Sequence, residues 1–111
     1  MSDEPPSEFL EPWLVPGADN LAAMEAELAR EMRFNPRHPL NSVTARAVAR
    51  RADCDDVLFE ITGHESLLAV VHLTWSQSPE TRPACPDTTL FASWAEWTAT
   101  MKRDHEEWSL A

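Results

Sequence analysis

The 111-residue sequence contains only two glycines, two cysteines and no tyrosine. With so few glycines, the chain has no glycine-rich loop that could cradle a phosphate through its backbone amides. Cys54 and Cys85 do not have the spacing of a metal site or a redox motif, so we expect two reduced thiols, with a single disulfide as the alternative. No apolar run approaches the roughly 18 residues of a membrane-spanning helix.

Basic residues are also scarce, because nine Lys and Arg stand against 19 Asp and Glu, which gives a net charge of −10. A surface with this charge repels phosphate backbones and anionic lipid headgroups, which argues against nucleic acid and membranes as partners. A basic protein is the partner that the charge favours. The alternative is that the acidity only keeps a small protein in solution.

The first six residues contain neither a basic region nor an apolar segment, so they do not form a signal peptide, and we expect a cytoplasmic protein. Residues 1–16 are predicted to be an extended, partly mobile N-terminal segment because they are acidic and rich in proline. Within it, Trp13 and Leu14 are predicted to plug an apolar face, with docking into a partner as the alternative. Residues 17–111 are predicted to form a single α+β domain.

The longest run of strand-favouring residues extends from Leu67 to Trp75 and is predicted to be a central strand. Residues 42–51 and 57–62 also alternate with period two, although the alanines and arginines of 42–51 favour helix as well. Short turns connect the three segments, which predicts a three-stranded antiparallel meander. The proline-rich residues 76–87 are predicted to form a loop.

The first of two predicted helices has an apolar stripe and a charged face. Asp19 or Asn20 can cap it, and the stripe consists of Leu21, Met24, Leu28 and Met32. The charged residues that are expected to face solvent are Glu25, Glu27, Arg30, Glu31 and Arg33.

The second predicted helix begins at Ser93 and Glu96, which have the spacing of a capping box. Its inner stripe consists of Trp94, Trp97, Met101, His105 and Trp108. Three tryptophans at helical spacing are typical of a core, so we expect them to cover the alanine-rich face of the sheet. The predicted fold is therefore α+β, a two-layer sandwich with the order α-β-β-β-α and both helices on one sheet face.

The other sheet face is the candidate site. Its polar residues are Arg46, Arg50, Glu60, His72 and Thr74. If the N-terminal segment covers this face, they form a satisfied polar cluster; if the face is open, they form a platform for a ligand or a partner. His72 with Glu60 or Thr74 is the pair to consider for acid/base chemistry, and a hydrogen-bonded structural histidine is the alternative.

Other constellations are disfavoured. The acidic stretch of Asp53, Asp55 and Asp56 lacks the glycine and the downstream glutamate of a calcium loop, so it is predicted to be a turn. The four histidines are scattered, and neither an HxxxH pair nor a zinc spacing with cysteine occurs. No serine lies in a glycine elbow, and no cofactor or metal is expected.

Several segments carry a resemblance to a known family: His38–Leu40, Ala49–Arg51, Asp55–Phe59, Val70–Trp75 and the helix from Trp94 to Trp108. Together they resemble a family of small, uncharacterised bacterial proteins with a VHLTW-type strand, over residues 20–108. The resemblance implies no activity and assigns no functional residue. A further likeness, to immunity proteins of toxin systems, depends only on size, acidity and mixed α+β class.

Two functional hypotheses follow. The preferred one is a non-catalytic protein-interaction module, of immunity or antitoxin type, whose acidic surface binds a basic partner. The alternative is a small enzyme or ligand-binding protein that uses the outer sheet face around His72. A homodimer is compatible with either hypothesis.

Overall fold

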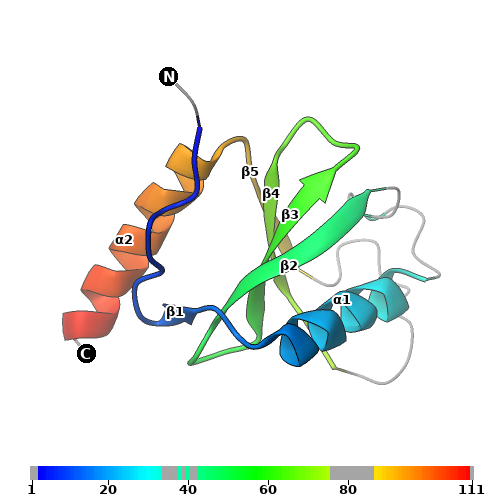
Figure 1. Ribbon diagram of the computed structural model, residues 1–111, viewed down its shortest axis with the longest axis horizontal. Coiled ribbons are helices and arrows are strands. Elements are labelled where there is room, and N and C mark those ends of the chain that lie inside the picture. Colours follow the sequence, from blue (N-terminus) through cyan, green and yellow to red (C-terminus); the bar gives the residue numbers. More distant parts are fainter. Residues whose placement is uncertain (1–2, 34–37, 39, 41–42, 76–86, 111) are drawn as a thin grey trace.

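The computed structural model describes residues 3–33, 38, 40, 43–75 and 87–110 (Figure 1). The elements follow the order β1 (Trp13–Leu14), α1 (Ala18–Met32), β2 (Thr44–Arg51), β3 (Asp56–Thr62), β4 (Leu68–His72), β5 (Thr88–Phe91) and α2 (Trp94–Leu110). The strands form one five-stranded antiparallel sheet in sequence order, with β3 in the middle. The α+β class is confirmed, and the sheet contains two strands beyond the predicted meander.

The two additional strands lie at the edges of the sheet. In β1, Trp13 pairs with Arg51 and Leu14 with Arg50, so part of the N-terminal segment is a short edge strand. β5 pairs with β4 and begins at Thr88, directly after the predicted loop, of which residues 76–86 lie outside the described part of the chain. Both strands are too short to show an alternation in the sequence.

The two helices cover opposite faces of the sheet, so the prediction of a two-layer sandwich with both helices on one face is wrong (Figure 1). α1 packs on the face that contains Val57 and Phe59, whereas α2 packs on the face that contains Leu58 and Leu68. Successive side chains of a strand point to opposite sides of the sheet, so Leu58 points away from α1 and is buried only because α2 packs on its side. The layers are therefore helix, sheet, helix.

The tryptophans of α2 do not cover the alanine-rich face. Ala47 faces α1, while Trp94 and Trp97 pack on the other side of the sheet. A bulge between Ala47 and Ala49 shifts the register of β2 and turns Ala49 toward α2. One end of the predicted stripe also leaves the core, since the residue at its C-terminal end, Trp108, is 39% exposed.

The apolar stripe of α1 is confirmed, with its three later members buried and Leu21 partly buried. The helix begins at Ala18, after Gly17, and has no side-chain cap, so the prediction of a cap at Asp19 or Asn20 is wrong. The prediction that Glu27 faces solvent is also wrong, because Glu27 is buried and forms an ion pair with Arg30.

Glu31 of α1 is also buried rather than solvated. Its carboxylate accepts hydrogen bonds of 3.0–3.2 Å from the backbone amides of Thr74 and Trp75, just after β4. Trp75 has a positive φ of 52°, and two successive amides in such a turn point at one anion. Glu25 accepts a hydrogen bond of 2.8 Å from the amide of Ala47. Acidic side chains of α1 therefore fasten the helix to the sheet.

The N-terminal segment lies along α2 (Figure 1). The Asp3 carboxylate accepts hydrogen bonds from the first amides of α2, at 2.7 Å from Trp94 and 3.0 Å from Ala95. Ser93 also caps the helix, through a bond of 3.1 Å from the amide of Glu96. Trp13 is buried in the α2-side core, as the plug prediction requires, whereas Leu14 is 40% exposed.

Candidate functional site

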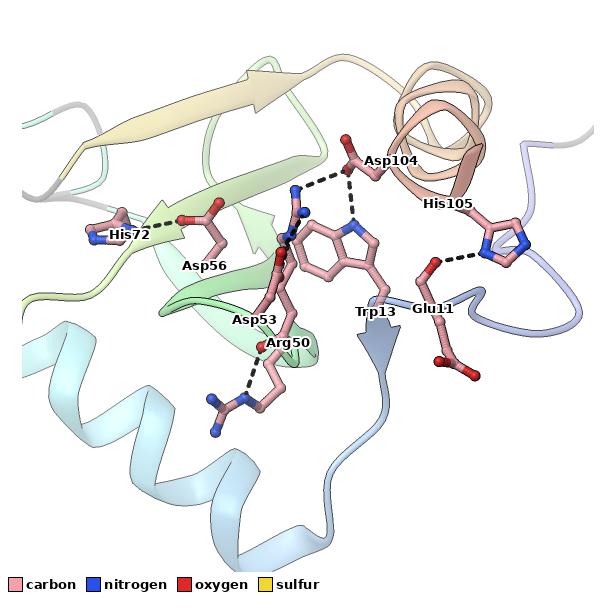
Figure 2. A network of polar contacts seen from close by, with 9 residues as sticks. Glu11, Trp13, Arg50, Asp53, Asp56, His72, Asp104 and His105 are labelled. Atoms are coloured by element: carbon pink, nitrogen blue, oxygen red, sulfur yellow. Dashed lines mark hydrogen bonds and ion pairs between the residues drawn. The ribbon is translucent and has the colours of Figure 1, made fainter. Parts of the chain in front are cut away.

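The five predicted site residues do not form one platform. Arg46 and Glu60 lie opposite each other on β2 and β3 and form an exposed ion pair of 2.5 Å. Arg50 lies beyond the bulge, opposite Val57, and therefore points to the α1 side of the sheet (Figure 2). Thr74 follows the end of β4, and its amide is bound to α1. The structure thus pairs Arg46 with Glu60 and leaves His72, Arg50 and Thr74 outside that pair.

His72 has a partner that the sequence did not indicate. It lies opposite Asp56 in the register of β4 and β3, and its Nδ1 is 2.8 Å from Asp56 Oδ1 (Figure 2). The expected partners lie elsewhere, since Glu60 is opposite Leu68 and the Thr74 amide is bound to Glu31. Asp56, predicted to be a turn residue, is the first residue of β3.

A shallow cavity of about 320 Å³ opens beside this pair, and we call it the His72 pocket. Its lining residues are Asp56, Val70, His72, Asp87 and Thr89. These residues come from three adjacent strands. Asp56 belongs to β3, Val70 and His72 belong to β4, Thr89 belongs to β5, and Asp87 directly precedes β5. Among the described residues, the N-terminal segment contributes nothing to this lining.

Carboxylates dominate the electrostatics of the His72 pocket. The hydrogen bond to Asp56 is the largest influence and raises the pKa of His72, and the charges of Asp56, Asp55 and Asp87 raise this pKa further, against a smaller lowering by burial. Asp55 and Asp87 are exposed, and although their backbone oxygens accept hydrogen bonds from the amides of Leu73 and His72, neither carboxylate makes a hydrogen bond or ion pair with another described residue. The pocket is therefore negatively charged in either protonation state of His72.

Other potentially reactive groups near this edge are engaged or inert. Asp53 accepts two hydrogen bonds from Arg51, at 2.9 and 3.0 Å, which lowers the pKa of the Asp53 carboxyl. Burial raises the pKa of the Cys54 thiol, which disfavours a reactive thiolate. Within the described ranges, no three His, Cys, Asp or Glu side chains are grouped so that they could hold a metal ion.

A second polar network joins α2 to the sheet (Figure 2). Trp13 Nε1 donates a hydrogen bond of 3.0 Å to Asp104, and Arg51 lies 3.6 Å from the same carboxylate. His105 Nδ1 is 2.7 Å from the backbone oxygen of Glu11. The contacts of Trp13 and Glu11 with α2 span more than 90 residues of sequence, and the network holds the N-terminal segment between α2 and β2, so we assign it a structural role.

A cavity of about 310 Å³ lies on the other side of the sheet, between α1 and β2. Its lining combines apolar side chains, such as Leu28, Met32 and Val43, with the charged residues Glu25 and Arg33. Its carboxylate, Glu25, is engaged by the amide of Ala47. The His72 pocket, with the unengaged carboxylate of Asp87, is the better candidate site.

The sequence pointed to His72 but missed Asp56, Asp87 and Thr89. Asp56 stands at the boundary of a turn and a strand, and only the strand register shows that it faces His72. Asp87 and Thr89 belong to the region of β5, which was not predicted as a strand. The available signal was the spacing of two between Thr89 and Phe91, which puts both on one face of a strand. It covers too few residues to be distinctive.

Comparisons of the chain with protein-family models, with curated proteins and with solved structures gave no match. The resemblance to the VHLTW-type family therefore stays a prediction. No helix in the described part of the chain has both the length and the apolar character needed to cross a membrane.

Proposed function

We propose that the protein is a non-catalytic protein-binding module that recognises a basic segment of another protein, with a cationic side chain of that segment in the His72 pocket. The observation that carries this proposal is the pocket itself, where Asp56 and Asp87 line a cavity to which the described residues contribute no Lys or Arg. Asp55 adds a further unengaged charge beside it.

The chemistry of the pocket suits a guanidinium or ammonium group. Arg presents a planar fork of donors that matches carboxylates, while Lys presents a compact charge. The net charge of −10 steers a basic protein toward the surface and increases its rate of association. Arg46 and Glu60 neutralise each other, so this ion pair adds no net charge to the same face of the sheet.

The proposal that the module is of immunity or antitoxin type, which means that it binds another protein, is supported by its small size, its α+β class and its negative charge. We also propose a cytoplasmic location, which the free thiol of Cys54 supports.

A labelled hexa-arginine peptide provides a direct test of the proposal. We expect it to bind more weakly as salt rises from about 0.05 to about 0.3 M, because the attraction is electrostatic. Asp87→Asn should weaken binding roughly two- to fivefold, as expected for the loss of one exposed charge pair. Glu65→Gln is the matched control, because it removes one exposed charge outside the pocket. Equal effects of the two variants, or binding indifferent to salt, would reject the proposal.

A second candidate function, a small enzyme or ligand-binding protein, is favoured by the pair of His72 and Asp56. A histidine whose Nδ1 is held by a carboxylate is oriented to take up a proton at Nε2, as a general base does. Incubation with a panel of small esters tests this function. Turnover that His72→Gln removes would favour an enzyme, and turnover unaffected by this variant would count against one.

A further inference from the structure

We infer that His72 and Asp56 form a proton-controlled gate on the His72 pocket, so that the pocket binds a cationic side chain more weakly when His72 is protonated than when it is neutral. The inference rests on the proposed function and adds a mode of regulation to it. It concerns the coupling between a proton on His72 and a cation in the same cavity.

The geometry places proton and guest in competition. His72 lines the pocket, its side chain is 51% exposed, and its Nδ1 is hydrogen-bonded to Asp56 Oδ1. When the imidazole is neutral, Nδ1–H donates to Asp56 and the carboxylate keeps its full charge for a guest cation. When Nε2 is also protonated, the imidazolium neutralises Asp56 and repels the guest.

Among the described residues, the charged groups that act on the ring are three aspartates. Asp56 faces it from β3, Asp55 from the turn before β3, and Asp87 from the residue before β5. The other lining residues, Val70 and Thr89, are uncharged. With neutral His72 a bound cation therefore meets two lining carboxylates, with Asp55 beside them, whereas with protonated His72 it meets the same carboxylates and one adjacent cation.

Acidic neighbours favour the protonated form of His72. The hydrogen bond to Asp56 is the largest cause, and together with the charges of Asp56, Asp55 and Asp87 it raises the pKa of His72 above its ordinary value of 6.5. Coupling between two sites is reciprocal, so a proton on His72 and a bound cation disfavour each other by the same free energy. If protonation weakens cation binding, a bound cation must therefore lower the pKa of His72.

The other described histidines lie outside the pocket. His64 Nδ1 accepts a hydrogen bond from the amide of Ser66 in the turn after β3, and His105 is bound to the backbone of Glu11. His38 is buried and contacts Thr88. His64 is therefore a suitable control, because it is an exposed histidine that does not touch the lining.

The test measures the Kd of the hexa-arginine peptide from about pH 6 to about pH 8.5, a range that brackets the ordinary histidine pKa. For the unmodified protein we expect the Kd to rise roughly two- to fivefold on acidification, as for one added exposed charge. His72→Gln should make the Kd independent of pH, while His64→Gln should keep the wild-type profile. Asp56→Asn should move the inflection to lower pH, because it removes the largest influence on the His72 pKa.

A second readout is the NMR titration of the His72 ring, whose pKa should fall when the peptide saturates the protein. If the peptide binds but His72→Gln keeps the wild-type pH dependence, or if the pKa of His72 does not change, the gate is overturned and the proposed function stands. If the peptide fails to bind at any pH, the proposed function is overturned together with the gate.

Discussion

His72 Nδ1 and Asp56 Oδ1 lie 2.8 Å apart across the ladder of β3 and β4, although 16 residues separate them in the sequence. Backbone pairing fixes this contact, since the two residues are direct cross-strand partners. The pair stands at the end of the sheet, where an acidic pocket opens. Its position and its charged surroundings are the basis for the functional proposals.

The first prediction concerns the effect of pH on stability. The folded-state pKa of His72 is raised, so the imidazolium stabilises the fold below the unfolded pKa of about 6.5, and this contribution is lost as pH rises through the folded pKa. The Tm advantage of the wild type over Asp56→Asn should therefore be larger at about pH 5.5 than at about pH 8.5. Scanning calorimetry of both proteins gives the difference in Tm at each pH. A difference that grows with pH would contradict the assigned contact between His72 and Asp56.

The second prediction concerns the buried carboxylate of Glu31. Glu31→Ala leaves the amides of Thr74 and Trp75 without their acceptor and should cost about 1–3 kcal/mol of unfolding free energy. Glu31→Gln keeps an acceptor and should cost less. The exposed Glu107, as Glu107→Ala, serves as the control in urea denaturation. An Ala variant at position 31 as stable as the control would show that the contact does not stabilise the fold.

The third prediction compares two tryptophans of α2. Trp97 is fully buried against the rings of Phe9, Trp13 and Trp94, at centroid distances of 5.4, 5.4 and 6.0 Å. Trp97→Ala should cost about 3–5 kcal/mol, which approaches the whole stability of a small domain. Trp108→Ala should cost about 1 kcal/mol or less, because this side chain is partly exposed. Urea denaturation followed by circular dichroism separates the two; similar losses would refute the assigned packing.

The fourth prediction concerns the cap that Asp3 provides from a distance in sequence. Asp3→Ala removes the acceptor for the first amides of α2 and should cost about 0.5–2 kcal/mol. Glu8→Ala, an exposed acid of the same N-terminal segment, is the matched control and should have little effect. Thermal denaturation gives the comparison, and an Asp3 variant indistinguishable from the control would mean that the segment does not cap the helix.

Local patterns predicted β2, β3, β4 and both helices because each has enough residues to show its period. The predicted layering was wrong because it left one side of the sheet without a helix, and Leu58, between Val57 and Phe59, is buried on that side. Three consecutive buried residues indicate a strand covered on both faces, so the sequence contained a signal for helices on opposite sides. The bulge after Ala47, which reverses the expected direction of Ala49, leaves no comparable mark in the sequence.

The candidate site was predictable only in part. His72 stood out as an imidazole in an apolar strand, but its partner depends on register, which alternation alone does not determine. The sequence also cannot distinguish the buried Glu31 from its exposed neighbours, because the backbone amides that Glu31 binds lie 43 and 44 residues away. Contacts of this kind are settled by tertiary structure.

The most direct test of the central claim is to map peptide binding by NMR. On addition of hexa-arginine to the ¹⁵N-labelled protein, the account predicts that the largest amide shifts occur at Asp56, Val70, His72, Asp87 and Thr89, which line the pocket. Shifts concentrated elsewhere, for example at the exposed Glu106 and Glu107 of α2, or spread evenly over the acidic surface, would contradict it.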